Sequence, residues 1–319
     1  MIVLGMFTAG LVLLYVGGEA LVRGASAIGV RFGMSPMIVG LTIVAFATSA
    51  PELAVAIGAA LRDAPGLAVG NVVGSNICNL TLIVGIVVLL SRPALREKLI
   101  TFELFVVLAG TAIASIMLLD GTLERVDGAV LFAGIVFYIG VAVWRLHSDD
   151  EPLAEDETAS SVPDVSAKLS VQIIACVLGV AALVLGSDWL VRACVAIATQ
   201  LGIAPAVIGL TAAAFGTSLP EIAASVVAAR HRHPDLAAGN LIGSNIFNLL
   251  AVLGATALVT PLDMGFVTVW DVAIMCVTTL LSLALMYFRP RLTRIDGSIL
   301  IVVYIAYIGF AFSPSAAPL

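Results

Sequence analysis

Charged residues are scarce in this sequence. They make up 11% of its 319 residues, whereas an average soluble domain contains about 25%. No long basic run is present, and His and Cys occur only three and four times. The P-loop, the glycine fingerprint of dinucleotide-binding folds and the HExxH motif are all absent. These absences argue against nucleic-acid binding and against the common nucleotide-dependent or zinc-dependent enzymes.

Hydrophobic residues instead make up 61% of the chain, with a mean hydropathy of +1.14. A water-soluble fold of this length could not bury so much apolar surface, so we expect lipid to be the solvent. Each predicted crossing is helical, because a lipid-exposed backbone must satisfy its own hydrogen bonds. We therefore predict an all-α membrane protein with ten transmembrane helices, at residues 2–22, 36–61, 67–91, 101–119, 127–146, 170–192, 205–229, 236–259, 267–288 and 296–313.

One sustained polar segment separates the fifth and sixth apolar stretches. Residues 147–168 are acidic and contain Pro and Ser, which is typical of a solvated linker. The sequence thus predicts a first five-helix unit at 1–146, an acidic linker at 147–168 and a second five-helix unit at 169–319.

The two units repeat one another. The segment that begins at Pro36 aligns with the one at Pro205, and the segment at Gly70 aligns with the one at Gly239, both with the same offset along the chain. Because each unit has an odd number of crossings, the second must enter the membrane upside down. This predicts the inverted-topology repeat of secondary transporters.

Lys and Arg residues predict the orientation. With the N-terminus outside, all but three of the 15 Lys and Arg residues fall on the inner side, the exceptions being Arg62, Arg125 and Arg192. Inner loops of membrane proteins are enriched in these residues. We therefore expect both termini outside the cell membrane and the acidic linker in the cytoplasm.

The second and seventh crossings each contain a Thr-Ser-x-Pro-Glu motif, which ends at Glu52 and Glu221. Proline frees the carbonyl four residues back, so we predict a helix break there, with the carbonyls of Ala45 and Ala214 as further candidates to face an ion. A carboxylate at mid-membrane costs several kcal/mol unless it is paired. No Lys or Arg lies at a matching depth, so the expected partner is a bound cation.

The third and eighth crossings each open with Gly-Asn-x-x-Gly-Ser-Asn. Ser75 and Asn79 are four residues apart and so share one helix face, as do Ser244 and Asn248. The candidate ligands are all oxygens, which suit hard cations such as Ca²⁺ and Na⁺. The remaining motif asparagines either form hydrogen bonds to the ligands or pack the helices together, and we favour the second role. They are Asn71, Asn76, Asn240 and Asn245.

These two motifs, each present twice, resemble the α-repeats of the sodium/calcium exchanger family in the cation/Ca²⁺ exchanger superfamily, of the prokaryotic type without a regulatory insert. The resemblance implies a ten-helix inverted-repeat fold and exchange of Ca²⁺ for Na⁺ by alternating access, with the first helix of each half sliding against the rest. It implies no enzymatic activity and no cofactor. It also implies ion ligands at Thr48, Ser49, Glu52, Ser75, Asn79, Thr217, Ser218, Glu221, Ser244 and Asn248, with backbone oxygens from Ala45 and Ala214.

The sequence departs from the family pattern in two places. Many members have an acid where this chain has Asn248, so its site has at most two carboxylates. Many animal members carry a regulatory domain between the fifth and sixth helices, and residues 147–168 are too few to form one.

Two other functions remain open. In a Ca²⁺/H⁺ antiporter of the same superfamily, protonation of Glu52 and Glu221 would replace Na⁺ binding. A passive cation channel is less compatible with two inverted halves, because channels line an axial pore with rings from repeated subunits. The expected partners are Ca²⁺, Na⁺ and the lipid bilayer, without nucleic acid or an obligatory protein partner.

Overall fold

The computed structural model describes residues 2–91, 97–148, 168–201, 205–265, 267–289 and 291–311. Within the helices, the side chains of residues 97–100, 146–148 and 205–215 lie outside this description. The predicted linker lies almost wholly outside the described residues, since helix α7 ends at Ser148 and α8 begins at Leu169.

The first half has five helical crossings, three of which are composite. In chain order its elements are α1 (Ile2–Arg31), α2 (Pro36–Val39), η1 (Gly40–Val44), α3 (Ala45–Ala60), α4 (Pro65–Cys78), η2 (Asn79–Ile83), α5 (Val84–Ser91), α6 (Glu97–Met117), η3 (Leu118–Asp120), β1 (Thr122–Leu123) and α7 (Arg125–Ser148).

The second half repeats the five crossings, with one continuous helix in place of α2, η1 and α3 and with its strand after the third crossing instead of the fourth. Its elements are α8 (Leu169–Gln200), α9 (Pro205–Arg230), α10 (Pro234–Ile246), η4 (Phe247–Val252), α11 (Leu253–Val259), β2 (Leu262–Asp263), α12 (Val269–Phe288) and α13 (Arg294–Ala311). The two-residue strands β1 and β2 pair antiparallel and join the halves at one face of the molecule.

Nine helices in the described ranges are long and apolar enough to cross a membrane. The remaining predicted crossing, residues 205–229, coincides with the 26-residue helix α9. The predicted all-α membrane fold is therefore confirmed, although the sequence did not indicate the short strands.

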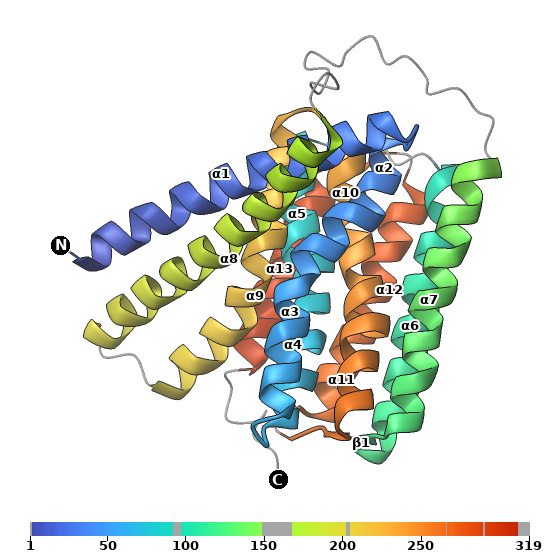
Figure 1. The fold of residues 1–319 in the computed structure, drawn as a ribbon. Coiled ribbons are helices and arrows are strands. Elements are labelled where there is room, and N and C mark those ends of the chain that lie inside the picture. Colours follow the sequence, from blue (N-terminus) through green and yellow to red (C-terminus); the bar gives the residue numbers. More distant parts are fainter. Residues whose placement is uncertain are drawn as a thin grey trace.

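The first helix of each half packs tightly against the other. A Cβ atom added to Gly10 would meet the backbone of Gly186, and one added to Gly17 would meet that of Gly179. Residues further along α1 therefore contact residues earlier in α8. The two helices are antiparallel, as inverted repeats require (Figure 1).

These two helices are longer than predicted. With 30 and 32 residues, each is about 45 Å or more long, whereas the hydrocarbon layer is about 30 Å thick. Figure 1 shows that both lie obliquely across the rest of the bundle. The predicted ends near residues 22 and 192 are wrong, because a strongly tilted helix uses more residues to cross the same layer.

The predicted helix breaks at the prolines are also wrong. Pro51 lies inside α3 and Pro220 inside α9, and both helices continue through them. The backbone instead becomes π-helical at η1, η2 and η4. Such π-segments occur frequently at functional sites because they widen the helix and redirect its side chains.

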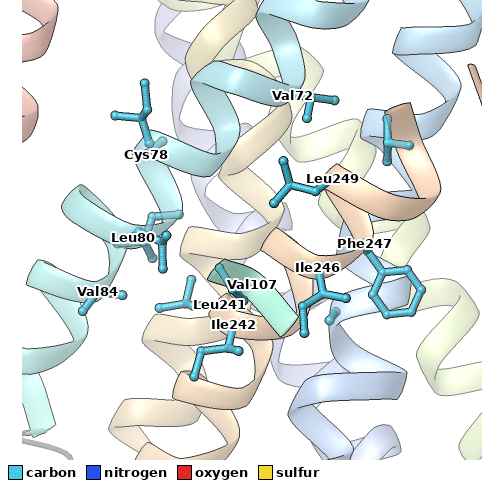
Figure 2. Close-up of a cluster of buried hydrophobic side chains, with 14 of the residues drawn as sticks. Val72, Cys78, Leu80, Val84, Val107, Leu241, Ile242, Ile246, Phe247 and Leu249 are labelled. Atoms are coloured by element: carbon cyan, nitrogen blue, oxygen red, sulfur yellow. The ribbon is translucent and has the colours of Figure 1, made fainter. Parts of the chain in front are cut away.

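The third and eighth crossings form the centre of the molecule. In each crossing, 78% of the most apolar 18-residue segment is buried, compared with 22% of the corresponding segment in α1 and in α8. Figure 2 shows their apolar contact, in which Leu80 and Val84 lie with Val107, Leu241 and Ile246. This core holds η2 and η4 in the middle of the bundle.

Equivalent turns of the two halves lie at opposite faces. Gly40 packs on Leu236, so α2 and α10 begin at one face, whereas Gly66 packs on Gly265 at the other (Figure 1). We call these the α10 face and the β face. The turn of residues 61–64 is on the β face and that of residues 231–233 on the α10 face. Asp63 (φ 56°) and Arg232 (φ 60°), which occupy equivalent positions in the two repeats, have the same unusual backbone conformation.

Candidate cation site

The two motif glutamates are completely buried between the halves. Glu52 on α3 and Glu221 on α9 both have 0% exposed surface, and their carboxyl groups lie close enough to interact electrostatically. All four carboxyl oxygens lack a hydrogen-bond partner among the described residues. None of the ion pairs in the described part of the chain involves either residue. Two acidic groups thus share one buried position without a protein cation.

The Thr48 hydroxyl joins α3 to α10. Its Oγ1 atom lies 3.3 Å from Oδ1 of Asn240 and 3.4 Å from Oγ of Ser244. It also lies 3.4 Å from the carbonyl oxygen of Ala45. Thr48 is near Glu221 as well, so oxygens from both halves converge at this point.

The matching contacts of the second motif join α9 to α4. The Ser218 hydroxyl donates to Oγ of Ser75 at 3.3 Å, and the Thr217 hydroxyl donates to Oδ1 of Asn71 at 2.9 Å. In each contact, a motif residue of one half meets the Gly-Asn-x-x-Gly-Ser-Asn motif of the other. The structure therefore brings together the predicted residues Thr48, Glu52, Ser75, Thr217, Ser218, Glu221 and Ser244.

Asn79 and Asn248 lie one turn beyond Ser75 and Ser244, at the start of η2 and η4. Both are fully buried, and their amide groups make no hydrogen bonds with the described residues. The hydroxyl of Ser49 is likewise buried without a partner in the described ranges. An unsatisfied buried polar group costs about 1–3 kcal/mol. Such groups are rare in folded proteins unless they serve a ligand, a water or a strained state.

Of the two predicted backbone ligands, the structure describes the surroundings of Ala45 but not those of Ala214. The carbonyl of Ala45 faces the Thr48 hydroxyl, directly after the π-segment η1. Ala214 lies in the part of α9 whose surroundings are outside the description.

Two of the four remaining motif asparagines support the predicted ligands. Asn71 and Asn240 accept hydrogen bonds from Thr217 and Thr48, which is the less favoured of the two roles that the sequence left open. Asn240 also donates from Nδ2 to Ser225 at 3.0 Å. Position in the repeat alone did not indicate this role, because Asn76 and Asn245 also occupy equivalent positions and bond within their own helices.

Asn76 and Asn245 bond within their own helices. Each donates its amide to the carbonyl four residues earlier, Val72 at 2.8 Å and Leu241 at 2.6 Å. The Oδ1 atoms of both are buried without a hydrogen-bond partner among the described residues, so their role in packing the helices stays a prediction.

Two serines outside the motifs bind carbonyls near the site. Ser187 on α8 donates to the carbonyl of Gly216, which Pro220 cannot bind because it has no N–H. Ser282 on α12 donates to the carbonyl of Leu80 at 2.7 Å, next to Asn79. The sequence predicted a freed carbonyl at Gly216 but gave no indication of its partner.

The composition of the site favours a hard cation. Within the described ranges, no group of three or more His, Cys, Asp or Glu residues could hold a metal. The site instead combines two carboxylates with hydroxyl and amide oxygens, which are ligands for Ca²⁺ and Na⁺ and not for softer metals.

The sequence profile of the family described as sodium/calcium exchanger protein matches residues 2–144 and 171–313 of this chain. The chain belongs to the sodium/calcium exchanger family. The matched ranges correspond to the two inverted repeats, and the segment between them is the short linker. The exchanger thus has the family's two-repeat architecture without a regulatory insert, and it is a cation antiporter of the membrane and not an enzyme.

Several relatives match this exchanger along nearly their whole length. The protein CaxA of Alkalimonas amylolytica is 38% identical, over 95% of this chain and 97% of its own. The sodium/calcium exchanger MaX1 of Methanosarcina acetivorans is 33% identical, over 95% and 96%. A solved structure of the sodium-calcium exchanger NCX_Mj superimposes with a TM-score of 0.82 at 28% identity, over 97% of this chain and 98% of that one. The fold of this chain is therefore shared with a solved exchanger.

Proposed function

We propose that this exchanger moves Ca²⁺ in exchange for Na⁺ by alternating access, with Glu52 and Glu221 as the charged ligands of one shared site. The observation that carries the proposal is the pair of fully buried carboxylates, one from each half, without a hydrogen-bond partner among the described residues. A buried carboxylate is tolerated only when it is paired. Since the described protein supplies no cation, the transported ions are its partners.

The oxygens around the glutamates fit the same two ions. Ca²⁺ takes six to eight oxygen ligands at about 2.3–2.6 Å, and Na⁺ has nearly the same radius. The surrounding hydroxyls and amides give Na⁺ a coordination shell, which a proton would not need. The proposed ligands are Thr48, Ser49, Glu52, Ser75, Asn79, Thr217, Ser218, Glu221, Ser244 and Asn248, with the carbonyls of Ala45 and Ala214.

The charge of the site favours two Na⁺ for each Ca²⁺. With both glutamates ionised the site carries two negative charges, which one Ca²⁺ or two Na⁺ neutralise. A third Na⁺ would leave an uncompensated charge in a low-dielectric cavity, at a cost of several kcal/mol. Asn248 offers a third ion only a neutral amide oxygen. Exchange at this stoichiometry moves no net charge across the membrane.

The names of two relatives support the coupling to sodium. MaX1 is named a sodium/calcium exchanger, and NCX_Mj is described as a sodium-calcium exchanger. The alternative is a Ca²⁺/H⁺ antiporter, in which protons replace Na⁺ on the same two carboxylates.

Flux in proteoliposomes tests both the site and the coupling ion. Vesicles loaded with Na⁺ should take up ⁴⁵Ca²⁺, whereas an imposed pH gradient without Na⁺ should not drive uptake. Glu52→Gln or Glu221→Gln should abolish uptake, because each removes one of two charges that face a divalent ion. Glu124→Gln, at an exposed position on the β face, is the control and should exchange normally. Wild-type rates in either buried variant would refute the site, and uptake driven only by protons would establish the alternative.

We also propose the orientation that the Lys and Arg distribution favours, with both termini outside the cell membrane. The α10 face and the linker of residues 147–168, between units 1–146 and 169–319, would then be cytoplasmic. The β face, with Arg62 and Arg125, would be extracellular.

A further inference from the structure

Glu19 connects α1 to the turn that follows α9. Its Oε2 atom lies 2.7 Å from Nε2 of His231, and its Oε1 atom lies 2.5 Å from Nη2 of Arg23. The Glu19 side chain is 19% exposed, compared with 69% for Arg23. The contact with His231 therefore lies on the inner side of α1, on the α10 face.

Close packing beside this contact holds α1 against α9. A Cβ atom added to Gly18 would lie 3.2 Å from the carbonyl oxygen of Ala223 and 3.2 Å from Cγ2 of Val227. Burial, together with the nearby His231 ring, lowers the pKa of His233, so this second histidine adds no charge at neutral pH. Arg23 and His231 thus supply the donors that Glu19 accepts from.

The inverted repeat contains a second copy of these groups. At the offset that relates the two halves, Asp188 corresponds to Glu19, Arg192 to Arg23 and Arg62 to His231. The turns that hold Arg62 and His231 have the same backbone conformation, including the positive φ of the following residue. The chemistry is also the same in both copies, because a carboxylate on the long helix again has a basic residue in the turn as its counterpart.

Among the described residues, the second copy lacks the contact between the long helix and the turn. Asp188 pairs with its neighbour Arg192 at 2.8 Å, but none of the ion pairs in the described ranges joins it to Arg62. The Asp188 side chain is 45% exposed, more than twice the 19% of Glu19. The two copies therefore have the same groups in two different arrangements.

We propose that Glu19 and His231 form a latch that closes the α10 face, and that Asp188 and Arg62 form the corresponding latch on the β face in the opposite transport state. The inference rests on the proposed alternating access. In an inverted repeat, one state is converted into the other when the two halves exchange their arrangements. As the α1–α8 pair moves, the Glu19 contact opens and the Asp188 contact closes.

Cross-linking tests whether both contacts occur in one protein. The double variants Glu19→Cys with His231→Cys and Asp188→Cys with Arg62→Cys are made in a background without the four native cysteines and treated with a short bifunctional thiol reagent. Each pair should cross-link and stop Ca²⁺ flux, and reductive cleavage should restore it. Asp188→Cys with His231→Cys, which lie on opposite faces, is the control pair and should not react.

Failure of this inference differs from failure of the proposed function. If the untreated variants exchange Ca²⁺ but the Asp188–Arg62 pair does not cross-link while the Glu19–His231 pair does, the second latch is refuted and the exchanger assignment stands. If the wild-type protein shows no exchange of any cation, the proposed function itself is refuted, whatever the cross-links.

Single substitutions in the two turns give a second measurement that a purely structural role would not reproduce. His231→Gln should weaken the state seen here, and Arg62→Gln, at the equivalent position, should weaken the opposite state. Exposed ion pairs contribute about 0.2–1 kcal/mol, so each variant should change the ratio of apparent Ca²⁺ affinities at the two faces by about 1.4- to 5-fold. The two changes must have opposite signs, and changes of the same sign would overturn the proposal.

Discussion

Ser225 gives Asn240 a partner that the first half of the exchanger does not provide. Nδ2 of Asn240 donates to Oγ of Ser225 at 3.0 Å, and both residues are fully buried. The equivalent of Ser225 in the first repeat is Ala56, and Nδ2 of Asn71 is buried without a partner in the described ranges. The repeat therefore contains one satisfied and one unsatisfied copy of the same contact.

Ser225→Ala should destabilise the protein by about 1 kcal/mol. An unsatisfied buried donor costs about 1–3 kcal/mol in soluble proteins, and hydrogen bonds between membrane helices average about 0.6 kcal/mol. Ala56→Ser should have the opposite effect, by about 0.5–1 kcal/mol, because its hydroxyl gives Asn71 the missing acceptor. Since Asn240 contacts Thr48, Ser225→Ala should also weaken Ca²⁺ binding.

Unfolding in detergent and Ca²⁺ titration of flux measure the two effects. Ser91→Ala is a matched control, because the Ser91 hydroxyl only donates to the Val87 carbonyl of its own helix, at 2.9 Å. Its stability should change little. The reasoning fails if Ser225→Ala is as stable as the wild type, or if Ala56→Ser unfolds more readily than the parent protein.

Three further predictions address packing, charge and topology. Gly17→Ala should impair folding or flux, because its Cβ would lie 2.8 Å from the Gly179 carbonyl oxygen. Gly5→Ala is the control and should be neutral, because its Cβ would meet nothing within 4 Å. Equal thermal unfolding of the two variants would contradict this prediction. Asn248→Asp should admit a third Na⁺ and make exchange sensitive to membrane potential, and strong voltage dependence in the wild-type protein would refute the two-sodium stoichiometry. Cysteines placed at position 151, outside the described residues, and at position 263 should react with an impermeant thiol reagent from opposite sides, and labelling from the same side would refute the orientation.

The repeat made most of the fold predictable from the sequence. Apolar length located the crossings, and the offset between Pro36 and Pro205 required the inverted halves. The ends of α1 and α8 were not predictable, because tilt is set by packing against neighbouring helices and not by hydrophobic length. The π-segments were not predictable either, since their geometry depends on tertiary contacts.

The candidate site was predictable from the sequence where a residue type alone indicates its role. A buried acid without a base at its depth, as at Glu52 and Glu221, indicates a cation from sequence alone. Supporting contacts are different, because they depend on which helices meet. Asn71, Ser187 and Ser282 have side chains that suit packing or capping equally well. Their partners are assigned only by the crossings of α4 with α9, of α8 with α9 and of α12 with η2.

Differences between the two halves have a consequence for transport. If the halves had identical sequences, the two access states would be equivalent arrangements of equal free energy. This chain departs from identity where α1 and α8 meet α9, since Ser187 corresponds to Gly18 and His231 to Arg62. In the present structure Ser187 binds the Gly216 carbonyl and His231 binds Glu19.

A glycine at position 18 cannot supply the hydroxyl that Ser187 supplies, so the opposite state lacks at least one of these contacts. A free-energy difference of about 1.4 kcal/mol between the states changes the ratio of their populations about tenfold. One or two hydrogen bonds are therefore enough to decide which state dominates. On the proposed mechanism, we expect the shared motifs to define which ions are carried. We expect the positions at which the repeats differ to set the side from which the exchanger binds its ions at rest.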